Sequence, residues 1–76
     1  MHLELVSYAK NDSPQGHVMG TVRVVDGTLS IDESIPEDIK ATIVGERAHT
    51  KVSHEAFLLK LERTFSGSYV RARLVR

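Results

Sequence analysis

The Asp26–Gly27 pair, within VVDGTLS at 24–30, is the feature that most constrains the fold. Glycine accepts the positive φ of a two-residue hairpin turn, and Asp-Gly between β-prone segments is a strong signal for one. The valines before it and TLSI after it therefore predict two antiparallel strands. HLELVSY at 2–8 predicts an earlier strand, joined to HVMGTVRVV at 17–25 by a loose loop, AKNDSPQG at 9–16. Together these segments predict a β-meander.

Side chains alternate between the two faces of a strand, so the 17–25 segment can be divided into two sides. Strict alternation puts Val18, Gly20, Val22 and Val24 on one side, and Met19, Thr21, Arg23 and Val25 on the other. A glycine inside a strand is typical of a bulge or of a close backbone approach, and we expect one of these at Gly20.

After the third predicted strand, the spacing between apolar residues changes from two residues to about four, which predicts a short helix over 36–44. Ser34 is placed to cap it, Pro36 suits its first turn, and Gly45 is expected to end it. The isoleucines that recur every fourth residue support the helix: Ile35, Ile39 and Ile43. The β-branched residues of ATIV at 41–44 leave a strand as the alternative. ERAHTKV at 46–52 is polar and is expected to form a loop or an edge segment.

A second and main helix follows Ser53, which is a good N-cap. Its apolar stripe is Phe57, Leu58, Leu61 and Phe65, and Gly67 is its expected stop. SYVRARLV at 68–75 alternates again and predicts a last strand. The predicted fold class is α+β, with a small, mostly antiparallel sheet (a β-meander plus the C-terminal strand) packed by one main helix and one short helix.

The 76 residues make one domain at most, predicted to span 1–76. A chain of this size buries only about 60% of the surface that it exposes when unfolded, so its core is marginal. It has no cysteine, so no disulfide can stabilise the fold. Good packing or docking onto a partner must supply the stability. Neither a secretory signal nor a membrane helix is expected, so the default is an intracellular protein or one released without a signal.

Charge is balanced overall but uneven along the chain. Lysine and arginine number ten, as do aspartate and glutamate, which disfavours a strongly basic nucleic-acid binder. Five acids and no base lie between Asp26 and Asp38, whereas four arginines and no acid lie between Arg63 and Arg76. This polarity predicts either steering of a partner or pairing of the two segments inside the fold.

No catalytic, cofactor-binding or metal-binding residues are predicted. Two histidine pairs, His49 with His54 and His2 with His17, fall short of the three or four ligands of a usual metal site. The serines of FSGSY lie between a helix and a strand, which reverses the order of a hydrolase nucleophile turn. Asp32–Glu33 and Glu37–Asp38 lack calcium-loop spacing. We therefore expect a protein that is not an enzyme.

The last strand carries the candidate binding residues. Arg71 and Arg73 must point to one side, with Tyr69 before them. A planar guanidinium binds carboxylate or phosphate through two parallel hydrogen bonds. The predicted interface comprises Arg63, Tyr69, Arg71, Arg73 and Arg76. The alternative is a solvent-facing strand whose arginines pair with acids on neighbouring strands, either Glu4 or the 32–38 segment.

The C-terminal half resembles small proteins encoded by phages and prophages of actinobacteria, near virion structural genes. Their helix of the type EAFLxxL and closing FSGSYxRAxL match Glu55 to Leu61 and Phe65 to Leu74, and VDGTLS fits their hairpin. The resemblance implies a virion-associated structural protein, a minor head or capsid-associated component that docks on capsid or head proteins. The sequence leaves a homo-oligomer open as well. It places the protein in the virion or the host cytoplasm, without a membrane. The alternative is a small phage regulator that binds a host protein or nucleic acid through the arginine-rich strand.

Overall fold

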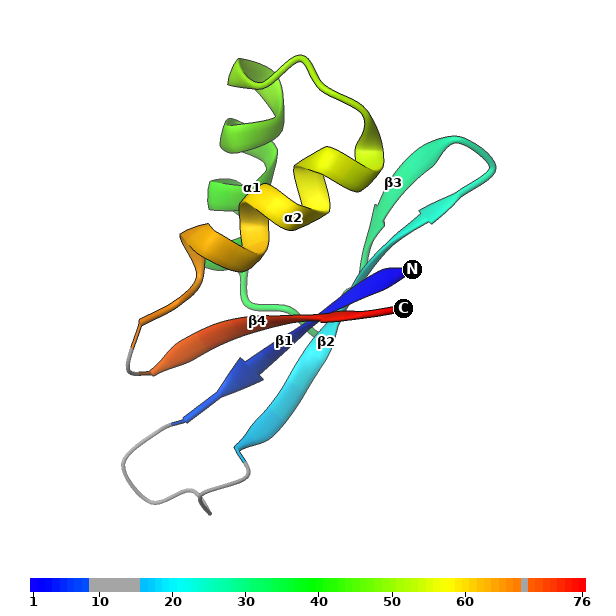
Figure 1. The fold of residues 1–76 in the computed structure, drawn as a ribbon. Helices are drawn as coiled ribbons and strands as arrows, with labels where there is room; N and C mark the ends of the chain where they lie inside the picture. The colour runs from blue at the N-terminus through cyan, green and yellow to red at the C-terminus, as the bar shows by residue number, and fades with distance from the viewer. Residues whose placement is uncertain (9–15, 68) are drawn as a thin grey trace.

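The computed structural model describes residues 1–8, 16–67 and 69–76. Its elements, in chain order, are β1 (His2–Ser7), β2 (His17–Val25), β3 (Thr28–Ile31), α1 (Glu37–His49), α2 (His54–Thr64) and β4 (Val70–Val75). The predicted α+β class is confirmed (Figure 1). The loop predicted at 9–16 lies outside the described residues except for Gly16.

The four strands form one antiparallel sheet in the order β3-β2-β1-β4. The predicted Asp-Gly turn joins β2 to β3, with Asp26 at φ 51° and Gly27 at φ 74°. The last strand joins the opposite side of the meander and pairs with β1, so that both ends of the chain lie next to each other in the sheet (Figure 1).

Strict alternation assigned the first residues of β2 to the wrong sides, because β2 contains a β-bulge at Met19. Leu5 pairs with Gly20, but the next residue, Val6, pairs with Val18, so Met19 is the extra residue. Val18 therefore lies on the face of Val6, opposite to Gly20, whereas Met19 packs against the core. The bulge that was expected near Gly20 is confirmed.

The core lies between one face of the sheet and the helices. Leu3 and Leu5 of β1 are fully buried there against Phe57 of α2. The other buried members of this cluster are Val22, Ile35, Ile43, Leu58, Leu61 and Ala72. Because side chains alternate along a strand, the residues between the core residues of each strand point to the opposite face of the sheet. No helix covers this second face, and we call it the open face (Figure 1). Of the predicted interface residues, Arg71 and Arg73 lie on the open face.

Helix α1 is longer than predicted. It runs from Glu37 to His49, so Gly45 lies inside it and the stretch 46–49 is helical rather than a loop. The strand alternative for 41–44 is also wrong. A glycine costs a helix interior only about 1 kcal/mol, which burial of Ile43 and partial burial of Ile39 can outweigh.

The end of α1 is fixed by Arg47 rather than by a glycine. Its Nη1 donates to the carbonyl oxygens of Thr50 (3.3 Å) and Val52 (3.0 Å), and its guanidinium lies 5.0 Å from the centre of the Phe57 ring. Cations near a helix C-terminus favour the helix dipole. One side chain therefore holds the α1–α2 connection against α2.

The start of α1 also differs from prediction. Pro36 is the N-cap residue and no side chain caps the helix. Ser34 instead donates from its hydroxyl to the carbonyl oxygen of Met19 (2.6 Å) and to Asp32 Oδ1 (3.0 Å). This ties the segment before α1 to the bulge in β2.

Helix α2 agrees with prediction at its start. Ser53 caps it by accepting from the backbone N–H of Ala56 (3.2 Å), and Phe57, Leu58 and Leu61 are buried. The helix ends at Thr64, before the expected stop at Gly67, and the backbone N–H of Phe65 donates to Leu61. Its apolar face covers β4 and β1.

Candidate functional site: the open face of the sheet

The predicted alternation of β4 is confirmed. Ala72 is buried, whereas Arg71 and Arg73 are exposed. In the register with β1, Arg71 lies opposite Val6 and Arg73 opposite Glu4. These two arginines therefore share the open face, as the sequence predicted.

Arg73 is engaged by a carboxylate on the neighbouring strand. Its Nη2 lies 2.7 Å and its Nε 3.0 Å from Oε1 of Glu4. Pairing with an acid on a neighbouring strand was the predicted alternative to an interface. Of the two acidic partners predicted for it, Glu4 is the one that contacts Arg73, and the 32–38 segment is not. Since the Arg73 side chain remains 57% exposed, the pair contributes only about 0.2–1 kcal/mol.

Arg71 has a different environment. Its Nε donates to the carbonyl oxygen of Gly67 (3.1 Å), and its guanidinium lies 5.4 Å from the centre of the Tyr8 ring. No carboxylate lies within ion-pair distance among the described residues. The guanidinium is therefore held in place, yet its charge is not neutralised by an ion pair in the described part of the chain.

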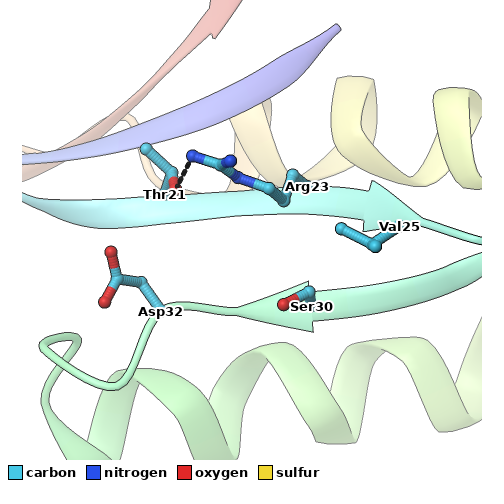
Figure 2. Close-up of a pocket in the computed structure, with 5 residues that line it drawn as sticks. All are labelled: Thr21, Arg23, Val25, Ser30 and Asp32. Atoms are coloured by element: carbon cyan, nitrogen blue, oxygen red, sulfur yellow. Dashed lines mark hydrogen bonds between the residues drawn. The ribbon is translucent and has the colours of Figure 1, made fainter.

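Arg23 on β2 is a third arginine of this face, and the predicted interface did not include it. Its Nη2 donates to Thr21 Oγ1 (3.2 Å; dashed in Figure 2), and no ion pair engages it within the described residues. Strand alternation had placed Arg23 beside Thr21. What was missing was the position of β4 beside β1, which puts Arg71 and Arg73 on the same face as Glu4 and Arg23.

A shallow hollow lies around Arg23, between β2 and β3. Figure 2 shows its lining residues, which are Thr21, Arg23, Val25, Ser30 and Asp32. Asp32 accepts hydrogen bonds from the backbone N–H (3.1 Å) and the hydroxyl (3.0 Å) of Ser34. The pKa of Asp32 is lowered, first by the Ser34 backbone N–H and then by its hydroxyl. A negative charge at one end of the hollow is thus stabilised.

The other predicted interface residues are not all on this face. Arg63 belongs to α2, in the helix layer on the opposite side of the sheet. Tyr69 is 67% exposed directly before β4, and its carbonyl oxygen accepts from the backbone N–H of Tyr8 (2.6 Å). Arg76 is exposed after β4. The structure therefore brings Arg71 and Arg73 together with Arg23 and leaves Arg63 apart.

The histidines do not converge. His2 pairs with Arg23 and His17 with Ser7, at opposite ends of the β1–β2 ladder. His54 Nε2 lies 3.0 Å from the carbonyl oxygen of Gly27, and its Nδ1 lies 3.5 Å from Nη2 of Arg47, so it helps to hold α2 over the β2–β3 turn. Within 1–8, 16–67 and 69–76, no group of three metal-ligating side chains is present.

The sequence matches no family model, and comparisons with curated proteins and with solved structures find no similar protein. None of the helices in the described part of the chain has the length and apolar character needed to cross a membrane.

Proposed function

We propose that this chain is a non-enzymatic docking protein that binds an acidic surface of another protein through the open face of its sheet. The observation that carries the proposal is the pair of exposed guanidinium groups, Arg23 and Arg71, that have no carboxylate partner among the described residues. Each is oriented by one hydrogen bond and can donate further ones to a carboxylate. An acidic protein surface supplies the missing charges.

A protein partner fits this face better than nucleic acid does. Glu4 and Asp32 lie on the same side of the sheet as the arginines and would repel a phosphate backbone. The chain is neutral overall, whereas nucleic-acid binders usually carry a basic patch on a basic domain. A protein surface can place carboxylates opposite the arginines and donors opposite Glu4 and Asp32.

The resemblance of the C-terminal half to phage and prophage proteins supports a place in the particle, as a minor head or capsid-associated component. In that setting the partner is a capsid or head protein, and the protein is found in the virion or the host cytoplasm. Mass spectrometry of purified virions tests this part of the proposal. Detection at a constant ratio to the major capsid protein supports it, and absence from intact particles contradicts it.

Capture from lysates of phage-producing cells tests the docking face itself. Three baits are compared: the wild type, the Arg23→Glu/Arg71→Glu double variant and Arg63→Glu. Arg63 is the matched control because it is an exposed arginine in the helix layer. We expect the wild type and Arg63→Glu to retain the same acidic protein and the double variant to lose it. Equal retention by all three baits contradicts the proposal.

The alternative, a phage regulator that binds nucleic acid, gives a different result with a defined probe. Phosphate contacts release counterions, so binding to duplex DNA weakens steeply as salt rises. We expect only weak retention on DNA at about 0.15 M salt. Tight binding that falls steeply with salt and is lost in Arg23→Glu/Arg71→Glu would establish the regulator instead.

A further inference from the structure

The hollow between β2 and β3 is lined by two opposite charges that do not pair with each other. Arg23 lies directly opposite Ser30 in the β2–β3 ladder, so Asp32, two residues further along the chain, is its diagonal neighbour. Diagonal neighbours in an antiparallel pair lie about 7–8 Å apart, which a long side chain can span. Among the described residues, however, the two groups form no ion pair.

Hydrogen bonds on each strand hold the two charges apart. The Arg23 guanidinium turns back along β2, where its Nη2 donates to Thr21 Oγ1 (3.2 Å; Figure 2). Asp32 is held on the other side by Ser34, whose backbone N–H and hydroxyl both donate to Oδ1. These two bonds, the backbone one first, lower the pKa of Asp32, so its carboxylate is ionised at neutral pH. The hollow therefore presents an oriented cation and an oriented anion to solvent.

The Arg23 end of the hollow is suited to a carboxylate. Among the described residues, the Nε and Nη1 of Arg23 and the hydroxyl of Ser30 donate to no acceptor. Both side chains line the hollow. A guanidinium and a neighbouring hydroxyl can donate together to the two oxygens of one carboxylate.

The Asp32 end is suited to the ammonium group of a lysine rather than to a guanidinium. Oδ1 accepts both bonds from Ser34, which uses its two lone pairs. Only Oδ2 is left without a hydrogen bond among the described residues. A guanidinium binds a carboxylate best through both oxygens at once, whereas an ammonium group is a compact charge that one oxygen can accept from.

We propose that the hollow recognises an acid–base pair on the partner protein, with a carboxylate bound by Arg23 and Ser30 and a lysine bound by Asp32. This inference rests on the proposed docking function and names what the open face selects. Side chains two residues apart on an extended strand are separated by about 7 Å, and those four apart on a helix by about 5–6 Å. Either spacing matches the diagonal separation of Arg23 and Asp32.

Carbodiimide crosslinking tests the lysine contact on the acidic protein that the wild-type bait retains. The carbodiimide activates the Asp32 carboxylate, the lysine amine attacks it, and an amide bond forms as the reagent leaves as its urea. We expect mass spectrometry to find residue 32 joined to a lysine of the partner. A complex that is crosslinked at other carboxylates and never at Asp32 overturns the proposal.

Affinity for the same protein separates the acid–base pair from general attraction to an acidic surface. Asp32→Asn removes the charge and keeps an oxygen that accepts from Ser34. Glu33→Gln is the matched control, because it removes the same charge from an exposed neighbour outside the hollow. General attraction predicts that both variants bind the acidic partner as tightly as the wild type or more tightly. We expect Asp32→Asn to bind about five- to tenfold more weakly and Glu33→Gln to bind like the wild type.

Failure of this proposal is distinguishable from failure of the docking function. If Arg23→Glu/Arg71→Glu loses the partner while Asp32→Asn keeps full affinity, the docking face stands and the acid–base pair is overturned. Equal losses in Asp32→Asn and Glu33→Gln overturn it as well. If no acidic protein is retained, or if all variants bind equally, both proposals fall. Thermal unfolding checks that Asp32→Asn is folded at the temperature of measurement, and the crosslink is made on the wild type.

Discussion

At the scale of single residues, Gly20 is packed directly against the segment that leads into α1. A Cβ at this position would lie 2.8 Å from Cγ1 of Ile35 and 2.9 Å from Oγ of Ser34. Ile35 is 2% exposed, so its side chain has little room to move away. The glycine is therefore required by close packing rather than by a turn.

We predict that Gly20→Ala lowers the free energy of unfolding by about 1–3 kcal/mol, because the added methyl group overpacks this contact. Gly45→Ala is the matched control. A Cβ at Gly45 meets nothing within 4 Å, and alanine favours a helix interior by about 1 kcal/mol. Urea denaturation measures both, and a Gly20→Ala variant as stable as the wild type contradicts the packing.

Asp32 predicts a pH dependence with a defined sign. Its folded-state pKa is lowered, so the stability that it contributes is complete above the ordinary aspartate value of about 3.9. That contribution is lost as the pH falls through the lower, folded value. We expect wild type and Asp32→Asn to differ in free energy of unfolding at neutral pH and to converge in strong acid. Urea denaturation from about pH 2 to 7 measures this, and a gap that persists in acid argues against it.

At the scale of elements, one carboxylate of α2 satisfies a backbone N–H group at the outer edge of β4. Glu62 is half-buried and accepts from the backbone N–H of Leu74. We predict that Glu62→Ala destabilises the fold by about 1–2 kcal/mol, since it leaves this N–H without its acceptor. Glu62→Gln keeps an acceptor oxygen and is expected to recover most of the loss. Amide hydrogen exchange at Leu74 is the readout, and equal exchange in wild type and Glu62→Ala contradicts the role.

The elements that the sequence predicted well depend on short-range rules. The Asp-Gly turn, the cap at Ser53 and the alternation of β4 each involve residues close together in the chain. The sequence prediction ended α1 too early because it interpreted Gly45 as the end of the helix. Its helical cost is overridden by Ile43 and by Arg47, whose contacts form only in the folded chain.

The candidate site was predictable only in part, for a related reason. Alternation alone placed Arg71 and Arg73 on one side. Which acid meets Arg73 depends on strand order, and that order puts β1 beside β4 and leaves β3, next to the acidic segment, at the far border. Arg23 joined the site for the same reason, since the pairing of β4 with β1 brings Arg71 and Arg73 onto the face that Arg23 of β2 already shared with Glu4. Long-range pairing of this kind leaves no local trace in the sequence.

At the scale of the whole molecule, both helices lie on one side of a four-stranded sheet and leave the other side uncovered (Figure 1). This open face carries Arg23, Arg71 and Arg73 together with Glu4 and Asp32.

The most direct measurement is photo-crosslinking in phage-producing cells, with a photoreactive amino acid at Val18 or at Glu55. Val18 is 44% exposed on the open face, in the same cross-strand row as Val6 and Arg71, whereas Glu55 is exposed on α2. We predict that position 18 forms an adduct with one partner protein, that Arg23→Glu/Arg71→Glu abolishes it, and that position 55 forms none. The same adduct from position 55 with none from position 18 would place the binding surface on the helices and contradict the account.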